Sequence, residues 1–350
     1  MGLLDRCDLR QRVQETLDAF VADHRPQLEA MASELGDMAD AVEEFLSGGK
    51  RLRAGFCFWG HRGAGGADSE AIVTAAAALE LFQACAIIHD DVMDGSETRR
   101  GRPAVHRRFA ALHEQRGWAG DRDGFGRGAA ILLGDLCLAW SDELLSSSWL
   151  IHDQARRVWG DMRGELMGGQ YLDLLEQVRG DSTVDSALRV ARFKSAKYTV
   201  VEPLHLGAAL ADAPQDVLAS YTAYGMPLGE AFQLRDDILG VFGDPSVTGK
   251  PAGDDLREGK RTVLVAMALE NSSEAQADLV RRKLGDPLLD DTGVDQMRTL
   301  LVETGAVARV ESLIVQRTEE AVEAIDHAPV AEEAAQVLRE LAEAATVRSH

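Results

Sequence analysis

Apolar residues recur through most of this chain at the three- and four-residue spacing of amphipathic helices, whereas the alternation typical of strands is scarce. Ala, Leu and Glu, which favour helix, run throughout. The predicted helices cover residues 8–45 in two pieces broken near Pro26, then 68–94, 129–146, 153–175, 184–211 and 216–241, and most of the chain from Thr262 onward. The pattern therefore predicts an all-α fold.

Two stretches lack helical spacing and are rich in loop-forming residues. Residues 116–128 contain many Gly and Arg residues and predict a flexible surface loop, which includes most of the sequence GFGRGA at 124–129. Residues 243–260 have the Gly, Pro and Asp density of an ordered loop. Because no internal repeat or low-complexity linker is visible, we predict one all-helical domain over residues 1–350, larger than a four-helix bundle.

The chain is strongly acidic, with a formal net charge of −21 and a sequence pI near 4.8. Such a surface repels nucleic acid and anionic lipid headgroups, so neither is expected as a partner. It also repels anionic small molecules. A site for a phosphorylated ligand must therefore supply its own metal ions and local Lys or Arg residues.

Features that would mark export or membrane insertion are weak, and a cytoplasmic protein is expected. The N-terminal sequence MGLLDRCDLR has neither the basic region nor the apolar core of a secretory signal. The longest apolar run, residues 71–88, is interrupted by Glu80 and Gln83, which favours a core helix without stable membrane insertion. The four cysteines show no CxxC spacing and are expected to be reduced thiols.

The helix predicted over residues 68–94 ends in an acidic segment, DDVMD. Asp90 and Asp94 are four residues apart, so a helix places their carboxylates on one face, ~6 Å apart, where they can bind hard cations such as Mg²⁺. Asp91 points ~100° away and is expected to support them. A solvated acidic helix end is the alternative interpretation, but carboxylates at a helix C-terminus oppose the helix dipole.

Basic residues accompany this acidic segment. Arg99 and Arg100 follow it directly, and guanidinium groups bind phosphate in a bidentate manner. An earlier Gly-rich turn, GGKRLR, carries Lys50, Arg51 and Arg53, and its glycines would let the backbone approach an anion closely. Either group alone could be ordinary surface charge, but next to paired carboxylates they favour a diphosphate site.

A second acidic segment, GEAFQLRDDILG, ends the helix predicted over residues 216–241. It places Gln233, Asp236 and Asp237 on about 1.5 turns of helix. The lysines around it are Lys194 on the preceding predicted helix and Lys250 and Lys260 in the loop that follows. Taken alone, each of these lysines would be interpreted as a surface residue.

The order of these segments is more specific than any one of them. GGKRxR, a helix ending in HDDxxD, RRGxP, KS, FQxxDD and two GK pairs follow one another between residues 48 and 262, and GQYLDL at 169–174 resembles a further motif, GQxxDL. With this order the chain resembles the trans-isoprenyl diphosphate synthases, the polyprenyl synthetase family. Within that family it is most similar to the bacterial geranylgeranyl-type enzymes.

The resemblance implies a fold and a reaction. The implied fold is the isoprenoid synthase fold, a large all-α bundle with a deep central cavity, in a homodimer. The implied enzyme is a prenyltransferase that condenses isopentenyl diphosphate head-to-tail with dimethylallyl, geranyl or farnesyl diphosphate, using three Mg²⁺ ions per active site. Ionisation of an allylic diphosphate is assisted by metals and fixed cations, so a Ser-His-Asp or Cys-His arrangement is not needed.

The resemblance also assigns roles to individual positions. The metal ligands would be Asp90, Asp94 and Asp236, with Asp91 and Asp237 in support. Around the allylic diphosphate would lie Arg99, Lys194, Ser195, Gln233, Lys250 and Lys260, of which Lys194 would join the aspartates in catalysis. Isopentenyl diphosphate, which binds without metal, would contact Lys50, Arg53, Gln83 and Arg100.

Three positions depart from the family pattern. Gln83 stands where a histidine often contacts isopentenyl diphosphate, and it can donate a hydrogen bond but carries no charge. Ala54 replaces the usual proline after GGKRLR, a change expected only to loosen the turn. Gly240 replaces the last aspartate of the second motif, which removes one carboxylate, although Asp244 and Asp254 are near in sequence.

The residues before Asp90 predict the product length. Family members that stop at fifteen carbons tend to have an aromatic residue four or five positions before the first aspartate, where this chain has the small residues Ala86 and Cys85. The first bulky aromatic is Phe82, eight positions before Asp90, which lowers the floor of the pocket by ~4.5 Å, about one isoprene unit. We therefore predict a C20 product, geranylgeranyl diphosphate.

Other interpretations stay open from the sequence. If Phe82 is ordinary core, the pocket would continue past Leu79 and give products of C25 or longer; a farnesyl product is a further alternative. A class I terpene cyclase would share the first acidic motif, but its N-D-x-x-S-x-x-x-E triad is not found in the sequence. A non-catalytic regulatory subunit is disfavoured because both acidic segments are serviceable.

Overall fold

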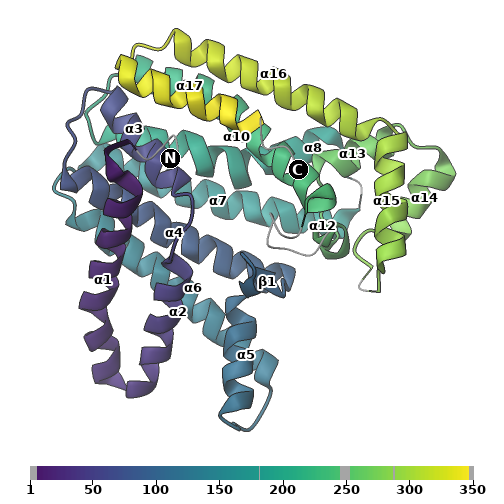
Figure 1. The fold of residues 1–350 in the computed structure, drawn as a ribbon, viewed down its shortest axis with the longest axis horizontal. Coiled ribbons are helices and arrows are strands. Elements are labelled where there is room, and N and C mark those ends of the chain that lie inside the picture. Colours follow the sequence, from purple (N-terminus) through teal and green to yellow (C-terminus); the bar gives the residue numbers. More distant parts are fainter. Residues whose placement is uncertain (1–5, 181, 245–252, 287, 347–350) are drawn as a thin grey trace. The chain divides into compact units, whose positions relative to one another are not determined.

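The computed structural model describes residues 6–180, 182–244, 253–286 and 288–346. Its regular structure is helical, apart from a short antiparallel hairpin of β1 (Thr98–Arg99) and β2 (Arg102–Pro103) (Figure 1). The predicted all-α fold is confirmed. The chain divides into two compact units, a first unit of Met1–Ala155 with Leu206–Asp212 and a second unit of Arg156–His205 with Ala213–His350. The single functional domain stays a prediction.

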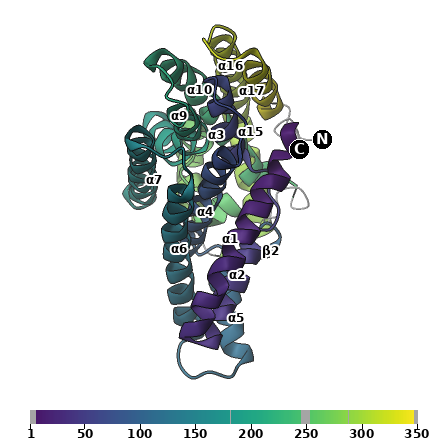
Figure 2. The same ribbon diagram turned by 90° about the vertical axis from the view of Figure 1, so that its left-hand side faces the viewer.

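The first unit is organised around α4. Its elements are η1 (Arg6–Asp8), α1 (Leu9–Met31), η2 (Ser33–Leu35), α2 (Gly36–Leu46), α3 (Leu52–Gly63), α4 (Glu70–Asp94), the hairpin, α5 (Val105–Gln115) and α6 (Arg122–Ser147). Helices α1 and α2 lie side by side (Figure 1 and Figure 2). Helix α4 packs against α6, α3 and α1, and its residues Leu79, Leu81 and Phe82 are fully buried.

Helix α4 is long and apolar enough to cross a membrane, with a mean hydropathy of 2.0 over its most apolar window. However, 78% of that window is buried within the protein, which is the packing of a core helix. The helix ends at Asp94 because Gly95 adopts a left-handed φ of 66° and donates its N–H to the carbonyl of Asp91. The DDVMD segment is thus the last turn of a buried helix.

Two predicted boundaries in this unit are wrong. Helix α1 continues through Pro26 and ends where Ala32 takes an extended conformation (φ −166°, ψ 140°). The predicted loop over residues 116–128 ends early, because the Asp121 side chain accepts a hydrogen bond from the backbone N–H of Asp123 (3.0 Å) and caps α6 at its start. The GFGRGA sequence is therefore helical rather than a flexible loop.

The second unit is built around α10 (Gln215–Phe242). Its other helices are α7 (Asp153–Arg179), α8 (Val184–Val190), η3 (Ala191–Val201), α9 (Glu202–Ala209), α12 (Asp254–Glu258), α13 (Val263–Glu270), α14 (Glu274–Lys283), α15 (Asp291–Glu303), α16 (Ala306–Asp326) and α17 (Glu332–Thr346); α7 begins and α9 ends in residues of the first unit. Helix α10 packs against η3 and α16. Leu234 and Ile238 of α10 share a buried core with Val310 and Ile314 of α16.

A π-helical segment, η3, interrupts the single helix predicted over residues 184–211. In a π-helix each backbone N–H bonds to the carbonyl five residues earlier, a geometry frequent at functional sites. Two helices approach η3 closely. A Cβ on Gly169 of α7 would lie 2.5 Å from the backbone nitrogen of Lys194, and one on Gly229 of α10 would lie 2.4 Å from Ala196 Cα. Glycine at these positions therefore permits the packing that holds η3.

Glu202, the first residue of α9, is buried beside a second carboxylate. Lys197 of η3 forms an ion pair with Glu165 of α7, and the charge of Glu165 acts on Glu202. Burial, followed by the charge of Glu165, raises the pKa of Glu202 to about 7. The second unit therefore contains a carboxyl group that changes charge near neutral pH.

Candidate active site

The three aspartates of DDVMD differ in burial. Asp91 is fully buried, whereas Asp90 and Asp94, one turn apart on α4, are partly exposed. Gln83 and Ile87 are also partly exposed, and the spacing from Gln83 through Ile87 and Asp90 to Asp94 places all four on one side of the helix. This side, the open face of α4, carries two of the predicted metal ligands, but the carboxylate oxygens of Asp94 are themselves buried.

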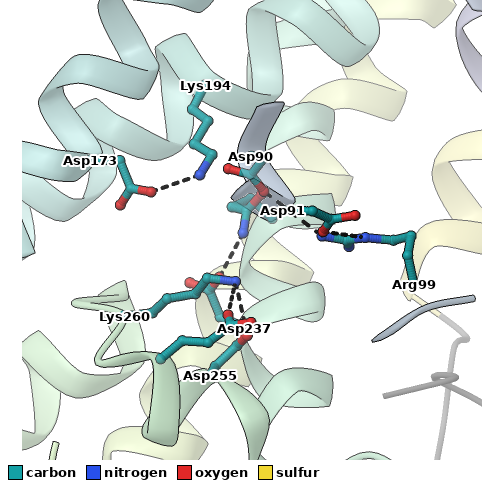
Figure 3. A network of polar contacts seen from close by, with 10 residues as sticks. Asp90, Asp91, Arg99, Asp173, Lys194, Asp237, Asp255 and Lys260 are labelled. Carbon is teal, nitrogen blue, oxygen red and sulfur yellow. Dashed lines mark hydrogen bonds and ion pairs between the residues drawn. The ribbon is translucent and has the colours of Figure 1, made fainter. Parts of the chain in front are cut away.

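Asp91 holds Arg99 of β1. The Arg99 guanidinium donates to one carboxylate oxygen of Asp91 through Nε at 2.9 Å and also through Nη2, and it lies 3.9 Å from Asp90 Oδ2 (Figure 3). Because Asp91 is fully buried, water screens this ion pair only weakly. Asp91 therefore keeps a guanidinium beside Asp90.

The GGKRLR turn separates its basic side chains. Its two glycines have left-handed φ values of 74° and 100°. Lys50 is exposed and Arg53 is partly exposed, but Arg51 turns inward, is 6% exposed and pairs with the buried Glu80 of α4. The inclusion of Arg51 in an anion-binding cluster is therefore wrong, because its guanidinium is buried and paired with Glu80.

Arg100 follows Arg99 in the hairpin turn, and its guanidinium lies over the ring of Phe45 in α2, 5.7 Å from the ring centroid. Partial desolvation lowers the pKa of Arg100, while the charge of Glu80 opposes this effect and neighbouring arginines, Arg51 first, reinforce it. Positive charge is crowded at this point of the first unit. Binding of an anion there would relieve the repulsion.

The residues predicted to set product length differ in their surroundings. Phe82 and Cys85 are fully buried, and Cys85 Sγ lies 3.7 Å from Nδ1 of His89. Ala86 is partly exposed. Phe82, Ala86 and Asp90 follow one another at four-residue intervals and so form one row on α4. Of the two small residues, Ala86 therefore lies in the row that leads from Asp90 to Phe82.

Lys194 extends from η3 in the second unit. Its Nζ donates to Asp173 Oδ2 of α7 at 2.7 Å (Figure 3), and both side chains are largely buried. Asp173 belongs to the GQYLDL sequence, and Gly169 of the same sequence permits the close approach of α7 to η3. The GQYLDL segment thus orients Lys194.

Hydrogen bonds link η3 to the second acidic segment on α10. Ser195 Oγ donates to Gln233 Oε1, and Gln233 Nε2 donates to Asp237 Oδ1 at 2.7 Å. Asp237 is buried, whereas Asp236 is exposed. Burial, opposed by the Gln233 hydrogen bond and reinforced by the charges of Asp255 and Asp236, raises the pKa of Asp237 to about 7. Asp236 is the accessible carboxylate of the pair.

Asp255, which no motif indicated, adds a carboxylate to this group. It lies at the start of α12, and a Cβ placed on Gly240 of α10 would be only 1.8 Å from Asp255 Oδ2. Lys260 donates to Asp255 Oδ1 at 3.2 Å (Figure 3) and pairs with Glu258 at 2.6 Å. The carboxylate of Asp255 therefore fills the space in which a side chain at position 240 would begin. Lys250 lies outside the described residues.

The donor chemistry of these aspartates fits magnesium bound together with a diphosphate. Within the described residues, no three His, Cys, Asp or Glu side chains are gathered into a ready-made metal site. Mg²⁺ is commonly bound by one or two carboxylates, and phosphate oxygens and water complete its coordination. Asp90 and Asp94 in the first unit and Asp236 in the second unit offer carboxylates of this kind.

Comparison with known proteins establishes the family. The sequence profile described as Polyprenyl synthetase matches residues 37–301. The chain belongs to the polyprenyl synthetase family. It is 34% identical over 274 residues to the geranylfarnesyl diphosphate synthase of Aeropyrum pernix (76% of this chain, 79% of the relative) and 33% identical over 295 residues to the geranylgeranyl diphosphate synthase of Mycobacterium tuberculosis (83% and 78%).

Comparison with a solved structure supports the same family assignment. A geranylgeranyl pyrophosphate synthase from Corynebacterium glutamicum, complexed with isoprenyl diphosphate and magnesium, is 37% identical, and the two chains superpose over their full lengths with a TM-score of 0.95. The resemblance inferred from motif order is confirmed. The chain is a prenyltransferase with the all-α isoprenoid synthase fold.

Three acidic residues that received no role from the sequence hold basic residues of this polyprenyl synthetase in place. They are Glu80, which pairs with Arg51, Asp173, which pairs with Lys194, and Asp255, which pairs with Lys260. Asp173 had a local signal in GQYLDL. Glu80 interrupts an apolar run, and a carboxylate on a core helix requires a partner. Asp255 had no comparable signal.

Proposed function

We propose that this polyprenyl synthetase condenses isopentenyl diphosphate with allylic diphosphates, head-to-tail and with Mg²⁺, and that its main product is geranylgeranyl diphosphate. The observation that carries the proposal is that each acidic motif adjoins a cation held by a dedicated carboxylate, Arg99 by Asp91 and Lys194 by Asp173. Similar proteins that are named geranylgeranyl diphosphate synthases support the product class.

Asp90, Asp94 and Asp236 would hold three Mg²⁺ ions, which neutralise the charge that develops on the departing diphosphate. Arg99 and Lys194 would donate hydrogen bonds to that diphosphate from preset positions, so little side-chain entropy is lost on binding. Ser195, Gln233, Lys250 and Lys260 would complete the allylic diphosphate site, with Asp237 in support.

Isopentenyl diphosphate would bind at Lys50, Arg53 and Arg100 in the first unit. Gln83 lies on the open face of α4, where it can donate one hydrogen bond without adding charge. The three basic residues must then supply the electrostatic attraction. The cytoplasmic location expected from the sequence and the homodimer implied by the family resemblance are part of this proposal.

Product length would be set along the row Phe82, Ala86 and Asp90 of α4. Eight residues of helix measure ~12 Å, and the small side chain of Ala86 leaves that distance open toward Phe82. The ring of Phe82 is fully buried and would form the floor. A chain that grows away from Asp90 would stop there at C20.

The test is to incubate the purified protein with Mg²⁺, isopentenyl diphosphate and dimethylallyl diphosphate, and to identify products by chromatography. A C20 diphosphate is expected, and Phe82→Ala should lengthen it. Phe58→Ala, another fully buried aromatic of the first unit, is the matched control and should change stability but not length. Cyclic hydrocarbons would indicate a terpene cyclase, and absence of any product would indicate a regulatory subunit; either result overturns the proposal.

A further inference from the structure

Arg51 is unusual both in its left-handed backbone conformation and in the burial of its charged side chain. It is the N-cap residue of α3, with a left-handed φ of 52° that is uncommon for a residue other than glycine. It is 6% exposed, although it lies between exposed Lys50 and partly exposed Arg53. Burying a guanidinium between two accessible cations requires strong compensating interactions.

Those interactions come from three elements of the first unit. Arg51 Nη1 donates to Glu80 Oε2 of α4 at 2.9 Å, and Nη2 donates to Gln14 Oε1 of α1 at 2.6 Å and to the backbone carbonyl of Leu46 in α2. The side chains of Arg51 and Glu80 are 5% and 4% exposed, so the ion pair is dry. A single side chain thus ties the GGKRLR turn to α1, α2 and α4.

The second oxygen of Glu80 contacts the same turn. Glu80 Oε1 accepts a hydrogen bond from the backbone N–H of Ala54 at 3.4 Å, in the first turn of α3. The first N–H groups of a helix lack partners within the helix, and a carboxylate there is favourable. A proline at position 54, the usual family residue, has no N–H to donate. Ala54 therefore adds a contact to the turn, which contradicts the expectation that it only loosens it.

We propose that Arg51 and Glu80 are positioning residues that fix the GGKRLR turn against α4. They keep Lys50 and Arg53 in register with Gln83, which lies three residues after Glu80 on the same helix. The charge of Glu80 is also felt by Arg100. One buried carboxylate, that of Glu80, therefore helps to position the residues assigned to isopentenyl diphosphate. This inference rests on the proposed function.

The test is Glu80→Gln, which keeps the size and one acceptor oxygen but removes the charge. Arg51 then loses its counter-ion, and the turn is expected to shift. We expect the KM for isopentenyl diphosphate to rise about tenfold or more, and the KM for the allylic substrate to stay within about twofold of the wild-type value. Glu70→Gln is the control: Glu70 lies on the same helix but is 80% exposed in its pair with Arg12, so neither KM should change.

A double variant separates positioning from stability. Arg51→Met/Glu80→Met removes both charges, and such replacements commonly restore stability. We expect its Tm to approach the wild-type value while the KM for isopentenyl diphosphate stays high. Arg51→Lys, which keeps the charge but has fewer donors in a different geometry, should give an intermediate KM.

The outcomes distinguish this inference from the proposed function. If the wild-type protein forms no product from isopentenyl diphosphate, the proposed function fails. If the wild-type protein is active but Glu80→Gln raises both KM values equally or neither, the inference fails alone. Recovery of both the Tm and the KM in the double variant would likewise show a purely stabilising ion pair and overturn it.

Discussion

Gly240→Ala tests whether the carboxylate of Asp255, which lies against Gly240 of α10, holds Lys260 in position for activity. The added Cβ would lie 1.8 Å from Asp255 Oδ2 and 2.5 Å from its Cγ, whereas favourable contacts begin near ~3.5 Å. The Asp255 side chain must therefore move by about 1.5 Å. Its contact with Lys260, which is 3.2 Å, would not survive such a shift as a hydrogen bond.

The size of the effect follows from the burial of the two groups. The side chains of Lys260 and Asp255 are 19% and 14% exposed, and a hydrogen bond to a charged group contributes about 1.5–3 kcal/mol. If Lys260 binds the diphosphate more strongly in the transition state, the same free energy lowers kcat/KM by about 10- to 100-fold. Gly240→Asp, which restores the family's aspartate, should be worse because it adds a like charge near buried Asp237.

The assay is kcat/KM for the allylic substrate at saturating isopentenyl diphosphate, together with the Tm. Gly160→Ala of α7 is the matched control, because a Cβ there meets nothing within 4 Å, and it should change neither value appreciably. Gly240→Ala/Asp255→Gly relieves the clash without restoring the carboxylate, so the Tm should recover and kcat/KM should not. Wild-type kcat/KM in Gly240→Ala would refute the placement of Asp255.

Three further changes probe the supporting residues. Asp91→Asn removes the charge that holds Arg99, so kcat/KM for the allylic substrate should fall about tenfold, and a value within about twofold of wild type would contradict this role. Gly169→Ala places a Cβ 2.5 Å from the backbone of Lys194; the free energy of unfolding, measured in urea, should fall by about 1–3 kcal/mol, and an unchanged midpoint would argue against tight packing of α7 on η3. The folded-state pKa of Glu202 is raised from 4.5 to about 7, so the folded protein binds the proton more tightly and loses stability as pH rises through that interval. Glu202→Gln should remove this loss, at most about 3 kcal/mol, and parallel Tm–pH curves for variant and wild type would show that Glu202 does not titrate there.

Helical periodicity was sufficient to place both acidic segments, because α4 and α10 are long, apolar helices that end close to them. The prediction of a helix break at Pro26 was wrong. A proline inside a helix removes one backbone hydrogen bond, but α1 continues past it because its buried row of Val13, Leu17 and Val21 packs in the core. Tertiary packing thus outweighed a local helix-breaking signal.

The contacts that hold the candidate site were harder to predict than its motifs. Asp255 lies against Gly240 because α12 packs on α10. Residue spacing along the sequence does not predict that contact. Arg51 and Lys50 are neighbours of the same charge, but only Arg51 is buried, against partners on α1, α2 and α4 that are distant in sequence. Sequence patterns gave a supporting role to Asp91, which holds Arg99, but none to Glu80, Asp173 or Asp255.

The π-helical geometry of η3 changes how the chain there responds to a change in length. Each wide turn takes up an extra residue, so deleting one residue within 191–201 would let the backbone relax to an ordinary α-helix. Side chains after that point would then keep nearly their present azimuth, whereas a deletion in an ordinary α-helix rotates every later side chain by ~100°. A single-codon deletion within 191–201 should therefore be tolerated better than one in an ordinary helix such as α10.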